Sequence, residues 1–213
     1  PITNCCLINL EDMLQNGTVI SETMIEKPHS FRTACTITTQ IITQVASSQY
    51  GGNTITLTAL APFVDISRKN YRNKYPNLSN EDIEKMVRDE VKDGIQTIQY
   101  QLITMSTTNG QAPFTSIFMY LDEAEKGKTR DDLAIIIEEV LRQRIKGVKN
   151  KQGVYITTAF PKLLYCLDED NIHENSKYWY LTKLAAECSA KRLVPDYISA
   201  KKMRELKEGN VFP

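Results

Sequence analysis

Five cysteines are the residues of this chain best suited to redox or radical chemistry, and they are Cys5, Cys6, Cys35, Cys166 and Cys188. A cysteine usually acts as a small buried apolar side chain, and Cys35 and Cys166 fit that interpretation because each lies in an apolar pattern. Cys5 follows Asn4 at the head of an apolar run, whereas Cys188 lies where an apolar helix gives way to Lys191-Arg192. A thiol at such an end can reach a cavity. Cys5 and Cys188 are therefore the candidates for chemistry.

Other common kinds of site have no support in the sequence. The cysteines lack CxxC or Cys/His spacing, and His29 and His173 are isolated, so we expect no metal on this chain. No GxGxxG or GxxxxGK[ST] loop is present, and Gly51-Gly52 alone is more typical of a helix stop than of a phosphate site. The 26 basic and 26 acidic residues cancel, which argues against a nucleic-acid partner. No run of about 18 apolar residues predicts a membrane span.

The composition, 41% apolar and 24% charged, is that of a globular protein. An odd number of widely spaced cysteines favours a reducing, cytoplasmic location, and no basic segment followed by an apolar core predicts a signal peptide. The chain begins at Pro1 without Met and opens directly into an apolar run. We therefore expect it to be an excised piece of a longer protein.

Helices and strands alternate along the chain. Apolar patterning predicts strands over 5–10, 114–121 and 154–167, the last kinked at Pro161. It predicts helices over 11–15, 31–48, 61–75, 79–102, 131–146, 179–191 and 199–207, and a turn over 109–113. Segment 31–48 is rich in β-branched residues, but its apolar residues recur every three or four positions over a length too great for one strand. The order predicts an α/β fold with parallel strand pairing.

Several segments resemble one enzyme family. Residues 186–192 around Cys188, followed by Pro195-Asp196, closely resemble the active-site cysteine segment of class III, oxygen-sensitive anaerobic ribonucleoside-triphosphate reductases. Four more segments match in the same order: Asn4-Cys5 with Leu7-Ile8 and Asp12-Met13-Leu14, then residues 44–52, then Asn109-Gly110-Gln111 with Pro113-Phe114, then residues 160–163. Five ordered matches cover essentially the whole chain and are much stronger than one pattern.

The resemblance implies a radical enzyme that reduces the ribose 2′-hydroxyl of ribonucleotides inside a ten-stranded α/β barrel. A glycyl radical in a C-terminal part would oxidise one cysteine to a thiyl radical, and by motif that cysteine is Cys188. A second cysteine, matched by Cys5, would help water leave from C2′ by supplying a proton or hydrogen. Cys6, on the opposite side of a strand, would be structural. Formate is the implied reductant, with Asn210 matching the asparagine of that subgroup.

The resemblance also implies partners. These are a ribonucleoside triphosphate substrate, ATP or deoxynucleotide effectors, a radical-SAM activating enzyme and a second copy in a homodimer. Glu26, Gln40 and Lys69 match the effector site, although each equally fits a solvated helix face.

Residues 1–213 fit a single domain, the first half of the barrel. The N-terminal regulatory domain, the zinc-binding cysteines and the glycyl-radical loop of the family do not match any part of this chain. We therefore expect no turnover by these residues alone, and association or partial disorder through their unpaired strand edges. Two alternatives stay open: a non-catalytic effector-binding and dimerisation module, or a glycyl radical enzyme that uses one cysteine.

Overall fold

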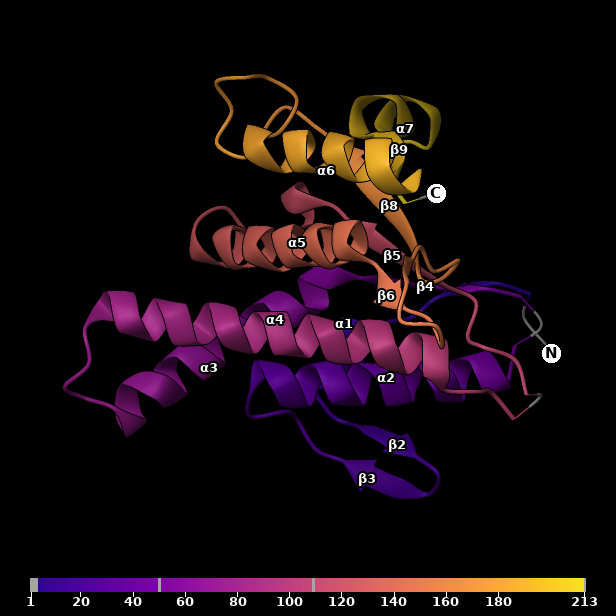
Figure 1. Cartoon of the computed structure of the whole chain (residues 1–213), viewed down its shortest axis with the longest axis horizontal. Helices are drawn as coiled ribbons and strands as arrows, with labels where there is room; N and C mark the ends of the chain where they lie inside the picture. Colours follow the sequence, from indigo (N-terminus) through magenta and orange to yellow (C-terminus); the bar gives the residue numbers. More distant parts are fainter. Residues whose placement is uncertain (1–3, 50, 109, 213) are drawn as a thin grey trace.

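The computed structural model describes residues 4–49, 51–108 and 110–212, and its centre is a five-stranded sheet (Figure 1). The strands follow the order β1-β4-β5-β8-β9, and every neighbouring pair is parallel. Their bounds are β1 (Cys6–Leu7), β4 (Asn53–Thr56), β5 (Thr115–Met119), β8 (Lys162–Leu167) and β9 (Asp196–Ser199). Because each connection returns through helices, the amino ends of all five strands lie at one edge and the carboxyl ends at the other.

The helices are α1 (Leu10–Gln15), α2 (Phe31–Ser47), α3 (Ala61–Lys74), α4 (Asn80–Thr104), α5 (Lys128–Lys146), α6 (Trp179–Arg192) and α7 (Ala200–Leu206). Two short 3₁₀ turns, η1 (Leu57–Leu60) and η2 (Leu121–Glu123), follow β4 and β5. Side-chain oxygens of Ser30, Ser79 and Ser199 accept hydrogen bonds from the first turns of α2, α4 and α7. Figure 1 shows α2, α4, α5 and α6 as one layer along the sheet.

The two faces of the sheet are covered differently. Residues that alternate along β5 separate them: Ile117 and Met119 join the main core under the helix layer, whereas Phe118 and Tyr120 join a smaller cluster on the other face. Helix α7 and the segment that ends in Val211 and Phe212 cover this second face. The ring centroids of Phe118 and Phe212 are 4.8 Å apart. The second face is thus closed mainly by the last part of the chain.

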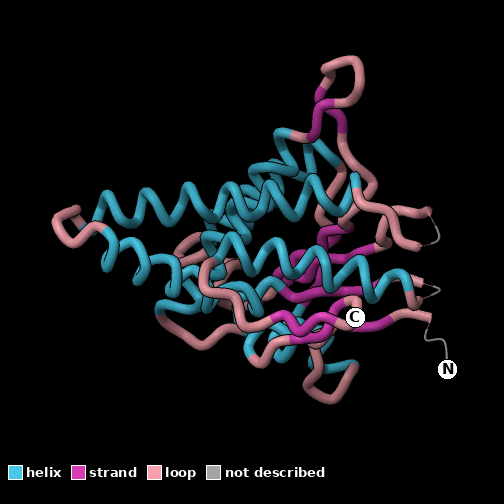
Figure 2. Tube along the Cα trace, turned by 90° about the horizontal axis from the view of Figure 1, so that it is seen from below, coloured by secondary structure: helices cyan, strands magenta, loops and turns pink. Residues whose placement is uncertain are grey.

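Two antiparallel hairpins stand apart from the main sheet, and Figure 2 shows one hairpin projecting from the body. The first pairs β2 (Thr18–Ile20) with β3 (Thr23–Ile25), and the second pairs β6 (Val148–Lys149) with β7 (Tyr155–Ile156).

The predicted α/β class with parallel pairing is confirmed, and each predicted helix is present within a few residues. The predicted strand over 5–10 is too long, because Asn9 caps α1 and Leu10 already belongs to that helix. Helix α5 begins at Lys128 rather than 131, after Gly127 in a positive-φ conformation. Segment 154–167 is not one strand, since β7 pairs in a hairpin and β8 in the main sheet.

Several elements were not predicted: the β2–β3 hairpin, the short strand β6, β4 and β9. The expected turn over 109–113 includes residue 109, which lies outside the described residues.

Within the described part of the chain the sheet is open, with β1 and β9 at its edges, so a closed barrel is not observed. None of the described helices combines the length and apolar character that a membrane crossing requires.

Candidate functional site

Cys5 lies at the amino edge of the sheet, directly before β1, and is exposed. It lines a pocket of about 350 Å³ between this edge and the end of α2. The other lining residues are Ala46, Gln49, Gly51, Gly52, Thr107, Gln111, Ala112 and Phe114. The pocket offers a thiol beside neutral amide and hydroxyl groups, with no acidic or basic side chain among its lining residues. Such a site can give a hydrogen atom or a proton to a polar ligand.

Two glycines set the position of Cys5. A Cβ atom on Gly51 would lie 2.2 Å from the carbonyl oxygen of Asn4, and one on Gly52 would lie 2.3 Å from the ring of Phe114. Both distances are far below van der Waals contact, so only glycine allows these segments to touch. Because α2 already ends at Ser47, the interpretation of Gly51-Gly52 as the helix stop was wrong. Gly51 instead allows close approach to Asn4, the residue that precedes Cys5, and Gly52 allows close approach to Phe114.

Cys6 faces the opposite way from the edge pocket. Its side chain packs against the main core, and its N–H donates to the carbonyl of Gly52 at 3.2 Å. Two residues further on, the N–H of Ile8 donates to the carbonyl of Thr54 at 2.9 Å. These bonds fix the register of β1 on β4, so the two adjacent cysteines have different surroundings.

Cys188 lies on α6 and is fully buried in the main core. Burial raises the pKa of its thiol to about 11, partly offset by Arg144 and Arg192, so the thiol is neutral near pH 7. Cys188 does not line the Cys5 pocket. The predicted pairing of the two thiols across a substrate stays a prediction.

Asn210 follows α7, and its side-chain oxygen accepts a hydrogen bond from the N–H of Phe212 at 3.0 Å. The residues after it, Val211 and Phe212, pack on the second face of the sheet. Asn210 therefore lies in a local turn and does not line the Cys5 pocket.

The three predicted effector residues lie at different places. Gln40 lines an open hollow of about 550 Å³ between α2, the β2–β3 hairpin and the segment after α4. Lys69 lines a second hollow with Lys27 and Lys128, and its ammonium pairs with Asp65 at 2.8 Å. Glu26 is exposed and lies in sequence between Ile25 of the first hollow and Lys27 of the second.

Three unpartnered polar groups that the sequence did not predict lie at the amino edge. Asn53 and Thr115 face each other across β4 and β5, are at most 1% exposed, and lack hydrogen-bond partners for their side chains among the described residues. Within the same described part, the Oε1 atom of Gln49 is also buried without a donor. The signal in the sequence that could have indicated them is a polar residue, Asn53 or Thr115, at a buried position of a short strand. An internal water is the usual partner of such groups.

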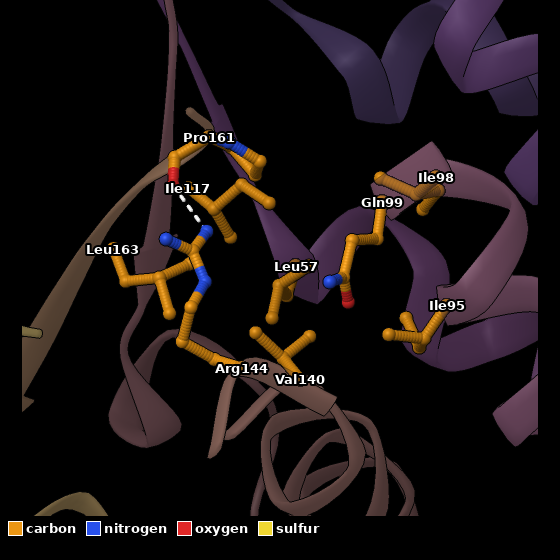
Figure 3. Close-up of a pocket in the computed structure, with 9 residues that line it drawn as sticks. All are labelled: Leu57, Ile95, Ile98, Gln99, Ile117, Val140, Arg144, Pro161 and Leu163. Carbon is orange, nitrogen blue, oxygen red and sulfur yellow. Dashed lines mark hydrogen bonds between the residues drawn. The ribbon is translucent and has the colours of Figure 1, made fainter. Parts of the chain in front are cut away.

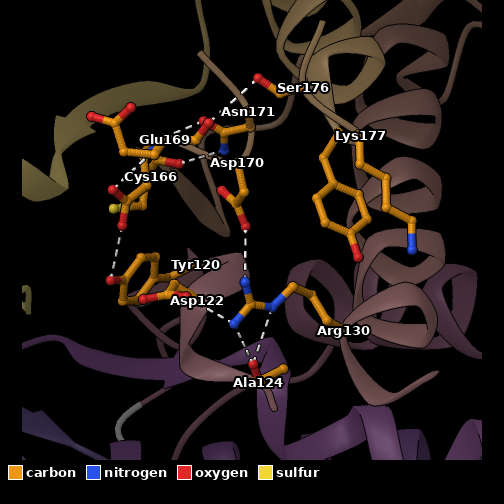
Figure 4. A network of polar contacts seen from close by, with 12 residues as sticks. Tyr120, Asp122, Ala124, Arg130, Cys166, Glu169, Asp170, Asn171, Ser176 and Lys177 are labelled. Carbon is orange, nitrogen blue, oxygen red and sulfur yellow. Dashed lines mark hydrogen bonds and ion pairs between the residues drawn. The ribbon is translucent and has the colours of Figure 1, made fainter. Parts of the chain in front are cut away.

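The carboxyl edge holds a dense polar network (Figure 4). Arg204 of α7 donates to both oxygens of Asp168, at 2.7 and 2.8 Å, and to the hydroxyl of Tyr120 at 2.9 Å. These bonds hold the pKa of Asp168 below its usual range. Nearby, buried Arg130 donates to the carbonyl of Ala124 and pairs with Asp122 at 2.8 Å. This network fastens α7 to the sheet.

Metal binding has no support in the described segments, where no group of three or more His, Cys, Asp or Glu side chains comes together in a way that could hold an ion.

Comparison with known proteins identifies the family. The family model described as anaerobic ribonucleoside-triphosphate reductase matches residues 1–212. The anaerobic ribonucleoside-triphosphate reductase of Enterobacteria phage T4 is 33% identical over an alignment of 222 positions, which covers 99% of this chain and 34% of the relative. The Escherichia coli K12 protein of the same name is 35% identical over an alignment of 207 positions, which covers 93% of this chain and 28% of the relative. The chain thus spans about a third of these relatives.

Solved structures show the same fold. The anaerobic ribonucleotide reductase from Thermotoga maritima, in complex with dATP and CTP, matches with a TM-score of 0.64 and 13% identity, over 95% of this chain and 34% of that one. A second anaerobic ribonucleotide reductase matches with a TM-score of 0.65 and 14% identity, over 95% and 32%. At this identity the structural likeness concerns the fold alone. Together with the match over residues 1–212 and two relatives above 30% identity, it leads to one conclusion: this chain belongs to the anaerobic ribonucleoside-triphosphate reductase family.

Proposed function

We propose that this chain forms part of the catalytic unit of an enzyme that reduces ribonucleoside triphosphates to deoxyribonucleotides, and that its contribution to the chemistry is Cys5. The observation that carries the proposal is the exposed Cys5 thiol in the edge pocket, while the adjacent Cys6 packs into the core. Reduction of a ribose 2′-hydroxyl requires a thiol that touches the sugar, and Cys5 is open to a ligand. The relatives are named as anaerobic ribonucleoside-triphosphate reductases, and this name supports the proposed reaction class.

The proposed role of Cys5 is to help the 2′-hydroxyl leave. Its S–H gives a proton to the hydroxyl oxygen as the C2′–O bond breaks, and the oxygen departs as water with the bonding electrons. A glycyl radical on a part of the enzyme outside these residues supplies the one-electron oxidation that starts the reaction, and formate is the proposed final reductant. The neutral groups of the pocket, Gln49 and Gln111, suit hydrogen bonds to sugar hydroxyls.

Cys188 is the weaker of the two cysteine assignments. A thiyl radical must come within contact distance of the sugar, yet Cys188 is 0% exposed and enclosed in the core beneath the helix layer. For Cys188 to meet a nucleotide, α6 would have to leave its position against α5. Our assignment of Cys188 as the radical thiol, and of Asn210 as a partner for formate, is therefore kept only as a proposal to be tested beside Cys5.

Effector binding is proposed for the two hollows beside α2 and α3. The hollow that contains Gln40 offers neutral hydrogen-bonding groups, which suit the edge of a nucleobase. The hollow that contains Lys69 also contains Lys27 and Lys128, and lysines suit phosphates. It also contains Asp65, which pairs with Lys69 and Lys128, so a phosphate would have to compete with this carboxylate. Glu26 lies in sequence between residues of the two hollows. A protein of similar fold, the anaerobic ribonucleotide reductase from Thermotoga maritima, has a solved structure with dATP bound in the specificity site. This supports the proposal of a deoxynucleotide effector.

The remaining assignments follow from the family as proposals. They are one domain over residues 1–213, a homodimer, activation by a radical-SAM enzyme and a cytoplasmic location.

The test is a pair of variants in the full-length protein, assayed anaerobically with its activating enzyme. We expect Cys5→Ala to lower nucleotide reduction by a factor of about 10³ or more, because no other group takes over the proton transfer. Cys6→Ala is the matched control, since it changes the neighbouring thiol that faces the core. It should retain most activity.

Deoxynucleotide binding, measured by calorimetry on the same variants, separates the alternatives. The proposal is supported if Cys5→Ala no longer reduces nucleotides but still binds the deoxynucleotide effector. Full reduction by Cys5→Ala would refute it and favour a one-cysteine glycyl radical enzyme or a non-catalytic module. Cys188→Ala should abolish the radical-dependent step if the motif assignment is right, and should change only stability if Cys188 is a packing residue.

A further inference from the structure

A small cavity lies beneath the helix layer, away from the Cys5 pocket (Figure 3). Its free volume is about 20 Å³, which holds about one water-sized atom. The walls are aliphatic except for two residues, Gln99 of α4 and Arg144 of α5. The aliphatic lining residues are Leu57, Ile95, Ile98, Ile117, Val140, Pro161 and Leu163. A cavity of this size and composition would normally be empty, so its two polar residues need an explanation.

Arg144 is a buried cation without a counter-charge in the described part of the chain. It is 3% exposed, and its guanidinium donates to the carbonyls of Thr158 and Pro161, which are both neutral. The other two most buried arginines differ, because Arg68 pairs with Asp132 at 2.6 Å and Arg130 with Asp122 at 2.8 Å. A buried charge that lacks an opposite charge costs folding free energy.

The nearby thiol of Cys188 does not supply the missing charge. Arg144 lowers the pKa of Cys188 only in part, and burial still holds it at about 11. The thiol is therefore neutral at pH 7. Burial lowers the pKa of Arg144 itself, but an arginine remains charged in proteins.

Gln99 lines the same cavity and also borders the open hollow beside Lys92 and Gln143. It is 9% exposed, and Figure 3 shows its amide and the Arg144 guanidinium lying on opposite sides of the space. Both groups offer N–H donors, and a guanidinium has five while an amide has two. Donors that converge on an apolar cavity beside an uncompensated positive charge are suited to an acceptor with negative charge.

We propose that the cavity between Arg144 and Gln99 binds a single monovalent, monoatomic anion, with chloride as the ligand. A monoatomic ion matches the small volume, whereas a carboxylate or phosphate is too large. Water would accept hydrogen bonds from both groups but would leave the arginine charge uncompensated. The bound ion would join α4, α5 and the segment before β8 at one point. Neither residue lines the Cys5 pocket, so the test of the anion site does not depend on the role proposed for Cys5.

Crystals of the full-length protein, grown with bromide in place of chloride, test the site directly. We expect an anomalous bromide peak in the cavity within hydrogen-bond distance of Arg144 and Gln99. An ordered water with no anomalous signal would overturn the proposal. So would a carboxylate from another part of the protein lying against Arg144.

A solution measurement uses a matched pair of variants. At constant ionic strength, replacing gluconate with chloride should raise the thermal unfolding midpoint of the wild-type protein. Gln99→Leu should lose at least half of that shift. Gln96→Leu, on the same helix but exposed, should retain it. Arg144→Gln would remove the charge directly, but it also removes hydrogen bonds to the carbonyls of Thr158 and Pro161 and can prevent folding. The Gln99 and Gln96 variants keep the test valid in that case. An equal chloride shift in Gln99→Leu and Gln96→Leu would contradict the proposal, as would no shift in the wild type.

Discussion

The two edges of the central sheet are built in opposite ways. At the amino edge an exposed thiol lies beside a pocket of neutral groups, and Asn53 and Thr115 lack partners among the described residues. At the carboxyl edge Tyr120, Asp168 and Arg204 satisfy one another, and Arg130 is held by Asp122 and Ala124. The charged groups lie where they stabilise the fold, and the uncharged edge is left open to a ligand.

If Cys5 has the role proposed above, chemistry and stability are separated along the strands. A reactive thiol benefits from surroundings that neither ionise it nor occupy its contact surface, and the amino edge provides them. The carboxyl edge instead ties α7 and the end of the chain to the sheet. We therefore expect substitutions at the carboxyl edge to change stability, and substitutions at the amino edge to change it little.

The largest stability effect should come from Arg130→Met. Removal of the guanidinium leaves Asp122 and Asp170 without their cation, and Asp170 already has a pKa raised by burial. We expect the free energy of local unfolding around β5 and β8 to fall by about 3 kcal/mol. Hydrogen exchange of the β5 and β8 amides in the full-length protein measures it. Arg142→Met, at an exposed pair with Glu138, is the control and should cost less than about 0.5 kcal/mol.

A smaller loss is expected for Arg204→Leu. Its guanidinium holds Asp168 and the Tyr120 hydroxyl, but its side chain is 37% exposed, so solvent screens part of the interaction. We expect a loss of about 1 kcal/mol, confined to α7 and the second face. The rate of proteolysis at α7 measures this loss of local stability. Lys202→Leu, which removes an exposed i,i+3 pair with Glu205, should leave the rate unchanged. Equal rates in the two variants would show that the Arg204 contacts do not hold α7.

The pH dependence of this contact follows from Asp168. Hydrogen bonds from Arg204 lower the folded-state pKa of Asp168 below its unfolded value, so its contribution to stability is fully present above the unfolded pKa. That contribution is lost as the pH falls through the folded pKa. The stability difference between wild type and Asp168→Asn should therefore shrink between about pH 5 and about pH 2. Urea unfolding at a series of pH values measures it, and a pH-independent difference would contradict the assignment.

The smallest effect is expected at the amino edge. Thr115→Val removes a buried hydroxyl that has no partner in the described part of the chain, so stability should be unchanged or higher by up to about 1 kcal/mol. Thr56→Val, at the other end of β4, removes a hydroxyl bonded to Glu123 and should be destabilising by about 1 kcal/mol. Hydrogen exchange of the β4 amides compares the two. A loss in Thr115→Val would show that an ordered water binds this hydroxyl.

The helices could be predicted because their signals are local. Ser79 caps α4, and the apolar stripe that follows has the helical period over its whole length. The short strand β4 could not be predicted, because four residues are too few to show the alternation of a strand. Its pairing with β1 and β5 also joins segments that are distant in the sequence. The β2–β3 hairpin turns through Ser21 and Glu22 with positive φ, residues that do not signal such a turn.

The site was predictable only in part. The family segments pointed to Cys5, and β1 separates it from Cys6 as the alternation of a strand predicts. The pocket around Cys5 could not be predicted, since it depends on contacts between Asn4 and Gly51 and between Gly52 and Phe114. The Asp168–Arg204 contact joins residues 36 positions apart and leaves no local signal.

The two glycines beside Cys5 have a consequence for mutational tolerance. Because a methyl group at residue 51 would collide with the backbone of Asn4 rather than with a flexible side chain, even Gly51→Ala must move the segment that carries the thiol. Gly51 has no charge and no reactive atom, yet its substitution would thus change the position at which the Cys5 thiol meets a ligand. In a library of random variants, residue 51 should therefore behave like a catalytic position although it takes no part in any bond-making step.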